Sequence, residues 1–253
     1  MPDLHVQSFG PADGPLVLAV HGLTGHGRRW AALARDHLAD VRIVAPDLRG
    51  HGRSPATPPW GFEAHVADLT AVLERVGAAV VVGHSFGGAV ALHLASERPD
   101  LVRSLVLLDP AIGLDPARLL TVAEQTLASP DYTNAAEARA DKANGSWGEV
   151  APELLDEELA EHLVPWPHGR VGWRINLSAV TACWGELARE FVLPPPGMRT
   201  SLVQAMKVQP PYVTPEFREA LAAARVTVAE WDCDHMVPQA RPAEVAALIR
   251  THL

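Results

Sequence analysis

One stretch, AVVVGHSFGGAV at positions 79–90, constrains the fold of this chain more than any other part of it. A run of β-branched residues leads straight into Gly-His-Ser-Phe-Gly at 83–87, and an apolar helical pattern follows without a spacer. Such a strand–turn–helix unit places Ser85 in a tight, strained turn, where side chains two positions before and after it would collide. The pattern predicts a nucleophile elbow, with the Ser85 hydroxyl raised above the end of the strand.

A phosphate-binding loop and an ordinary turn are the two other interpretations of this stretch. A P-loop requires a Lys near its end, and the dinucleotide-binding turn has a different glycine spacing. Residues 83–90 have neither feature, so we prefer the nucleophile.

Short β-type runs alternate with helical runs along most of the chain. The predicted strands are residues 16–21, 41–45, 79–83, 104–108, 200–206 and 226–231, and helical patterns cover 62–76, 87–98, 215–224 and 242–252. This alternation indicates βα units and a mostly parallel, doubly wound α/β sheet.

A connection of about 90 residues without a clear strand separates the fourth and fifth predicted strands, and so long a connection is usually functional. Helical patterns cover residues 116–128, 135–142, 152–162 and 173–191. The connection could be a helical insertion with its own small core, a lid over a pocket, or both. We therefore expect a core of residues 1–112 and 197–253, with a helical cap at 113–196.

Composition excludes several classes of protein. Apolar residues make up 48% of the 253 residues, too many for a disordered chain. The formal charge of −9 argues against nucleic acid or an anionic membrane as a partner, since both would be repelled.

Cys183 and Cys233 cannot form a disulfide scaffold, although one bridge between them is conceivable. The N-terminus has no signal-peptide pattern and no apolar run is long enough to span a bilayer, so we expect a cytoplasmic protein.

A serine hydroxyl is a weak nucleophile and needs a general base. Among the twelve histidines, His235 follows the last predicted strand and precedes the last predicted helix. This position puts its loop at the carboxyl edge of the sheet, beside Ser85. We expect His235 to be the base and His84 to pack or form local hydrogen bonds.

Acyl transfer also requires donors for a developing oxyanion. The first predicted strand ends in His-Gly-Leu-Thr, where the turn offers the backbone N–H of Leu23, and the residue after the nucleophile offers the N–H of Phe86. We predict that these two N–H groups form an oxyanion hole. The alternative for the first of them is a simple glycine turn at the end of a strand.

Four motifs now appear in order along the chain: HGL at 21–23, DLRGHGRS at 47–54, GHSFGG at 83–88 and DHM at 234–236. With these motifs the sequence resembles the α/β-hydrolase superfamily along nearly its whole length. The resemblance implies an eight-stranded sheet with a helical cap, and residues 4–9 could supply an edge strand. It also implies a structural role for the loop at Asp47, and it disfavours epoxide hydrolysis and dehalogenation, which use an Asp at the position of Ser85.

The family position of the triad acid has no carboxylate in this chain, since residues 206–212 read MKVQPPY. Some family members instead carry the acid at the end of the preceding strand, where Asp109 stands. We expect Asp109 to orient His235, although an Asp here can also cap a turn. Asp232 and Asp234 are the alternatives, and a dyad without an acid is the third possibility.

These features predict a serine hydrolase that cleaves a small, rather apolar carboxylic ester, thioester or lactone through an acyl-enzyme. The partner is a small-molecule substrate, and no cofactor or metal is required. A C–C bond hydrolase and a cofactor-free lyase or perhydrolase would use the same residues. A non-catalytic ligand receptor on the same fold is a further alternative.

Overall fold

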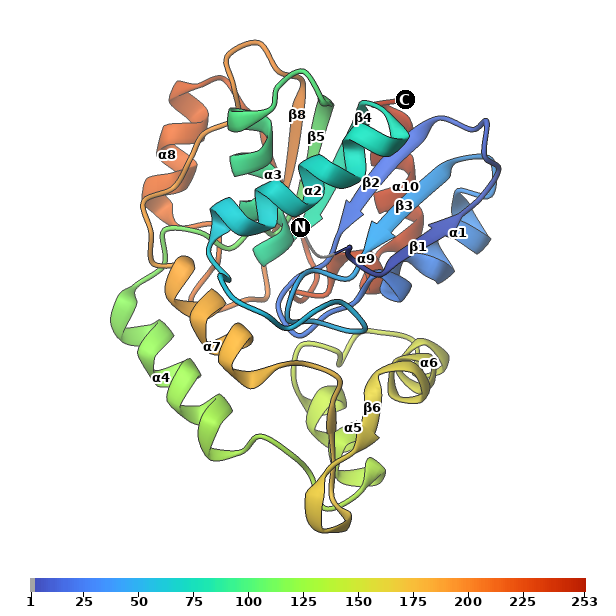
Figure 1. Cartoon of the computed structure of the whole chain (residues 1–253). Helices are drawn as coiled ribbons and strands as arrows, with labels where there is room; N and C mark the ends of the chain where they lie inside the picture. Colours follow the sequence, from blue (N-terminus) through green and yellow to red (C-terminus); the bar gives the residue numbers. More distant parts are fainter. Residues whose placement is uncertain (1–2) are drawn as a thin grey trace.

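The structure is a computed structural model and describes residues 3–253. Its centre is a seven-stranded sheet with the order β1-β3-β2-β4-β5-β8-β9 (Figure 1). The strands are β1 (Val6–Phe9), β2 (Leu16–Val20), β3 (Arg42–Pro46), β4 (Ala79–His84), β5 (Val102–Leu108), β8 (Thr200–Ala205) and β9 (Val228–Trp231). All neighbouring pairs are parallel except β1 with β3. The predicted mostly parallel α/β sheet is confirmed.

The eight-stranded sheet implied by the resemblance is wrong for the part of the chain that the structure describes. The expected edge strand is present as β1, which pairs antiparallel with β3. Within residues 3–253, no strand pairs with the outer side of β1. The sheet therefore ends at β1 on this side and at β9 on the other.

Side chains of the central strands alternate between two cores, as the two-residue period of a strand requires. In β2, Leu18 and Val20 face one core, while Val17 and Ala19 face the other. The first core is covered by α2 (Phe62–Val76), α3 (Phe86–Glu97) and α8 (Pro215–Ala223), and the second by α1 (Ala31–His37) and α10 (Pro242–Arg250). Both faces of the sheet are thus buried, which explains the apolar strands.

The segment 113–196, called the insertion below, lies beneath the sheet in Figure 1, at the end to which the parallel strands point. Its elements are α4 (Pro116–Ala128), α5 (Ala135–Asn144), α6 (Pro152–His162), β6 (Leu163–Pro165), β7 (Val171–Trp173) and α7 (Leu177–Glu186). Leu119 of α4 and Cys183 of α7 join the first core. Trp147 and Leu155 form a separate small cluster with Met236. One half of the insertion therefore packs on the main core, and the other half forms a separate small cluster that includes Met236 of the core.

Two expectations about the insertion were wrong. A two-stranded antiparallel hairpin, β6 with β7, stands where no strand was expected. The helix expected to begin at Trp173 begins at Leu177 instead, because Asn176 caps it by accepting a hydrogen bond from the N–H of Ala179. Strands of three residues are too short to show a period, so the sequence pattern could not separate them from the helix.

Cys183 and Cys233 are both buried free thiols, so the conceivable bridge between them is not formed. Among residues 3–253, no helix combines the length and the apolar character needed to cross a membrane.

Several histidines are buried in the fold as neutral rings. Burial lowers the pKa of His51 to about 4 and that of His65 to about 3. In the unfolded chain a histidine titrates near pH 6.5. Between these values the unfolded state binds more protons than the folded state, so stability falls as the pH falls from about 6.5.

We predict that each such histidine lowers the free energy of unfolding by about 1.4 kcal/mol per pH unit as the pH falls from about 6 to 4.5. Urea unfolding of the wild type and of His65→Asn across this range checks this, and the variant should show the shallower slope. His168→Asn, at an exposed position, should keep the wild-type slope. Equal slopes for the wild type and His65→Asn would contradict the prediction.

Candidate active site

Ser85 stands between the end of β4 and the start of α3, with the unusual backbone angles φ 54° and ψ −123°. A positive φ is costly for a residue with a side chain and persists only where the surroundings enforce it. The surroundings here are backbone. A Cβ atom at Gly83 would lie 2.5 Å from the carbonyl oxygen of Gly87, and one at Gly87 would lie 2.4 Å from that of Val20. The collisions inferred from the sequence are therefore present on both sides of Ser85.

The structure brings Ser85, His235 and Asp109 into one hydrogen-bonded chain. His235 Nε2 lies 2.9 Å from Ser85 Oγ, and His235 Nδ1 lies 2.6 Å from Asp109 Oδ2. Asp109 directly follows β5 and is fully buried, and its other carboxylate oxygen accepts a hydrogen bond from the N–H of Ala205. A carboxylate on Nδ1 fixes the tautomer in which Nε2 can accept the Ser85 proton.

The two alternative acids lie elsewhere. Asp234 accepts a hydrogen bond from the backbone N–H of His235 at 2.6 Å. Its carboxylate therefore bonds the main chain of His235 and not the imidazole ring. The side chain of Asp232 is 89% exposed and lies 3.7 Å from the Lys207 ammonium group. Within residues 3–253, Asp109 is the one carboxylate hydrogen-bonded to the His235 ring.

The turn that carries Leu23 packs directly against the nucleophile. A Cβ atom at Gly22 would lie 2.9 Å from Ser85 Cβ, so only glycine permits this approach. The carbonyl of Gly22 accepts hydrogen bonds from the N–H of Gly25, at 3.0 Å, and from His21 Nδ1, at 2.7 Å. In a trans peptide the N–H points away from the carbonyl, so these two bonds orient the Leu23 N–H. Phe86 is the first residue of α3. The backbone N–H of a residue in the first turn of a helix has no carbonyl partner within the helix, so the Phe86 N–H is free of intrahelical bonding.

The sequence as a whole places the chain in a family. The profile of the alpha/beta hydrolase family matches residues 17–248. The chain belongs to the α/β hydrolase family. Lipase LipV of Mycobacterium tuberculosis is 54% identical to it over 256 aligned positions, which cover 99% of this chain and 98% of that protein. The sn-1-specific diacylglycerol lipase ABHD11 of Mus musculus is 34% identical over 68% of this chain and 58% of its own length.

Solved α/β hydrolase structures superpose on nearly the entire chain. The structure of E-2-(acetamidomethylene)succinate hydrolase has a TM-score of 0.81 at 21% identity and covers 98% of this chain and 94% of its own. A marine microorganism esterase has a TM-score of 0.78 at 18% identity, with full coverage of both chains. At these identities the likeness establishes the fold.

The segment in which many α/β hydrolases carry the triad acid has another role in this chain. Tyr212 lies there, and its ring centroid is 4.3 Å from that of His235. The Arg118 guanidinium of α4 also lies over the Tyr212 ring, 4.8 Å from its centroid. The aromatic ring thus packs against the imidazole that Asp109 holds from its Nδ1 side. We infer that this packing restricts the ring plane of His235.

Sequence reasoning missed the part played by the side chain of His21. The N–H of Leu48 donates to His21 Nε2 at 2.9 Å, so the proton of this neutral ring is on Nδ1, which donates to the Gly22 carbonyl. Burial lowers the pKa of His21 well below its usual value, which keeps the ring neutral. The available signal was its place at the end of an apolar strand, directly before the glycine turn.

His84 packs against the His235 ring, as expected, but its hydrogen bond is to a residue distant in the sequence. Its Nε2 donates to the backbone carbonyl of His235 at 2.7 Å, and the two rings lie 4.8 Å apart. Burial lowers the pKa of His84 well below its usual value, so the ring is a neutral donor. The residue before the nucleophile thereby anchors the main chain that carries His235.

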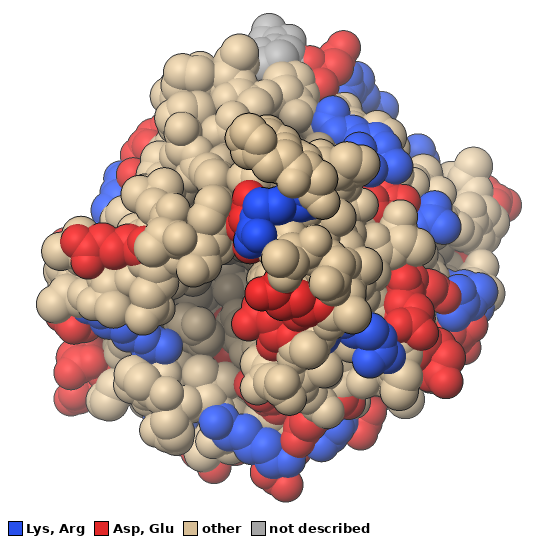
Figure 2. Space-filling view, turned by 90° about the horizontal axis from the view of Figure 1, so that it is seen from below, with Lys and Arg blue, Asp and Glu red and all other residues tan. Residues whose placement is uncertain are grey.

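The hydrogen-bonded residues Ser85, His235 and Asp109 are largely buried. Ser85 is 8% exposed, and the insertion lies over this end of the sheet. Seen from that side, the surface is hollowed between the part of the insertion with α4 and α7 and the part with α5 and α6 (Figure 2). Acidic and basic side chains are interspersed around the hollow. No group of three or more His, Cys, Asp or Glu residues in the described chain is placed to hold a metal ion.

Proposed function

We propose that this α/β hydrolase is a carboxylic-ester hydrolase whose catalytic residues are Ser85, His235 and Asp109. The single observation that carries the proposal is the hydrogen-bonded chain from Ser85 Oγ through the His235 ring to the buried Asp109 carboxylate. The relatives add support, since Lipase LipV matches over the full length and an esterase shares the fold. The geometry suits acyl transfer, because it pairs a nucleophile with an oriented base.

The proposed reaction has two halves. Ser85 Oγ attacks the ester carbonyl while His235 Nε2 takes its proton, and Asp109 stabilises the imidazolium that forms. The N–H groups of Leu23 and Phe86 hold the negative oxygen of the tetrahedral intermediate. His235 then protonates the leaving alkoxide, and the acyl group stays on Ser85. Water, deprotonated by His235, repeats the sequence on the acyl-enzyme and releases the acid.

We further propose that the insertion acts as a cap and that the substrates are small, rather apolar esters, thioesters or lactones. The insertion lies over the carboxyl edge of the sheet (Figure 1), and its surface is hollowed on the outer side (Figure 2), which supports a cap that admits small molecules. A site that is closed to bulk water strengthens every electrostatic contact with the transition state.

The nucleophile is tested with Ser85→Ala on a panel of chromogenic esters, thioesters, lactones and vinylogous diketones. We expect the wild type to turn over esters repeatedly with a burst of alcohol, and Ser85→Ala to lose about 10⁴- to 10⁶-fold in kcat. Preference for the diketones would indicate a C–C hydrolase instead. At most one turnover per site by the wild type would indicate a ligand receptor and contradict the proposal.

The acid is tested with Asp109→Asn, which we expect to lower kcat by about 10⁴ because the amide no longer holds the required tautomer of His235. Asp232→Asn is the matched control, since it removes a carboxylate near His235 in sequence that lies in solvent. Its kcat should stay within about twofold of the wild type. A loss below about tenfold in a folded Asp109→Asn protein would remove Asp109 from the triad.

A further inference from the structure

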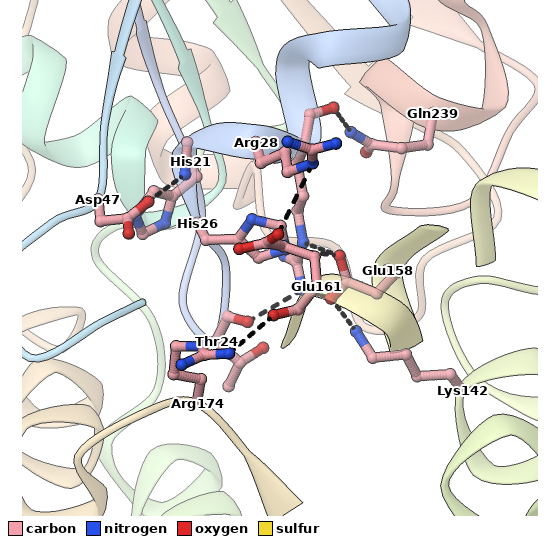
Figure 3. Close-up of polar contacts among 12 residues, drawn as sticks. His21, Thr24, His26, Arg28, Asp47, Lys142, Glu158, Glu161, Arg174 and Gln239 are labelled. Atoms are coloured by element: carbon pink, nitrogen blue, oxygen red, sulfur yellow. Dashed lines mark hydrogen bonds and ion pairs between the residues drawn. The ribbon is translucent and has the colours of Figure 1, made fainter. Parts of the chain in front are cut away.

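A buried carboxylate joins the insertion to the turn that carries Leu23. Glu158, on α6, is 3% exposed. Its oxygens accept hydrogen bonds from Arg29 Nε and Nη2 at 3.1 and 2.6 Å, from His26 Nε2 at 2.9 Å and from Lys142 Nζ at 2.6 Å (Figure 3). Arg29 and His26 belong to the core, while Lys142 belongs to α5. The carboxylate is therefore shared between two separate parts of the molecule.

Glu158 remains ionised in spite of its burial. Burial alone would raise its pKa, but the charges of Arg29 and Lys142, with the hydrogen bonds from His26 and Arg29, outweigh this and hold the pKa well below its usual value. The two cations are themselves enclosed, with side chains 6% and 11% exposed. An ion pair out of water holds its geometry more firmly than a surface pair, because it is screened less.

Arg29 also forms a hydrogen bond to the turn that carries Leu23. The same Nη2 that bonds Glu158 also donates to the backbone carbonyl of Thr24 at 2.9 Å. Thr24 directly follows Leu23 and has a φ of 57°, a strained value for a residue with a β-branched side chain. The backbone carbonyl of Arg29 in turn accepts a hydrogen bond from Gln239 Nε2, four residues after His235. Arg29 thus connects the insertion, the Leu23 turn and the short helix α9 (Val237–Ala240), which begins two residues after His235.

We propose that Glu158 is a positioning residue for the oxyanion hole and acts through Arg29. This inference rests on the proposed ester-hydrolase function. An oxyanion donor must stand within about 3 Å of the developing charge, and a strained turn relaxes unless its surroundings hold it. Glu158 fixes the guanidinium, the guanidinium fixes the carbonyl of Thr24, and the Leu23 N–H keeps its direction.

Glu161, one turn further along α6, supplies a matched control. It also bridges the insertion to the core, because its carboxylate pairs with Arg53 and lies 3.7 Å from Arg28 Nε. Among the described residues, its carboxylate forms no hydrogen bond or ion pair with Arg29 or with the Leu23 turn. Glu161→Gln therefore weakens the attachment of the same helix while leaving the chain from Glu158 to Thr24 intact.

The test compares Glu158→Gln with Glu161→Gln, using a p-nitrophenyl ester and the inhibitor butylboronic acid, which forms a tetrahedral anion on a nucleophilic serine. We expect Glu158→Gln to lower kcat by about 10- to 100-fold. This loss should not exceed the fall in kcat that follows removal of one oxyanion-hole donor, because the variant misorients the Leu23 N–H without removing it. KM should stay within about twofold, and the inhibition constant of the boronic acid should rise by about the same factor as kcat falls. Glu161→Gln should leave all three values within about twofold.

A second variant covers the case in which Glu158→Gln does not fold. Arg29→Lys keeps a cation beside Glu158, but its shorter side chain with one nitrogen cannot reproduce the guanidinium contacts to both Glu158 and Thr24. It should show the same fall in kcat and the same rise in the boronic acid constant. Near-ultraviolet circular dichroism reports whether each variant is folded.

The outcomes separate this inference from the proposed function. If the wild type hydrolyses no ester, the proposed function itself fails. If the wild type is active and folded Glu158→Gln or Arg29→Lys loses no more kcat than Glu161→Gln, the positioning role is overturned. A rise in KM alone, with kcat and the boronic acid constant unchanged, also overturns it.

Discussion

The close packing of backbone around Ser85 is the constraint on which the rest of the site depends. Glycines at 22, 83 and 87 let three chain segments meet without intervening side chains. Two hydrogen bonds to β5 and the segment after it then hold the Ser85 turn in place. The Ser85 N–H donates to the Leu108 carbonyl, and the Ser85 carbonyl accepts a hydrogen bond from the Ala111 N–H. The register of β4 with β5 pairs the last residue before Ser85 with the last residue before Asp109. The position of the buried acid is thus a consequence of the strand register.

Ser85, His235 and Asp109 could be found in the sequence for one physical reason. Parallel strands bring their carboxyl ends to a single edge, so residues directly after separate strands become neighbours there. A strand end is recognisable when a run of apolar residues precedes it, as LVLL at 105–108 does for Asp109 and AVVV at 79–82 does for the turn of Ser85. The same reasoning fails for the hairpin of β6 and β7, because strands of three residues carry too few side chains to show a period.

The cluster around Glu158 had no comparable signal. Its partners His26 and Arg29 are 132 and 129 positions away in the sequence, and neither follows a strand directly. Helix α6 contains Glu153, Asp156, Glu157, Glu158 and Glu161, which the sequence presents as an ordinary acidic, solvated face. Which of these carboxylates is buried depends on how α6 docks against the loop after the Leu23 turn. That orientation is set by tertiary contacts such as Trp147 with Met236, and no local pattern encodes it.

The energetics of this cluster favour a role beyond attachment. Removing charges from water costs several kcal/mol per ion, and apolar contacts of similar size usually stabilise a junction as well or better. The insertion already has such contacts, since Trp147 and Leu155 pack with Met236 of the core. Two cations, Arg29 and Lys142, nevertheless surround one carboxylate here. An apolar junction would hold α6 in place, but it could not direct a hydrogen bond at the Thr24 carbonyl. The guanidinium can, because one planar group bonds the carboxylate and the carbonyl in fixed directions. The cost of burying these charges is therefore best understood as the cost of orienting the turn.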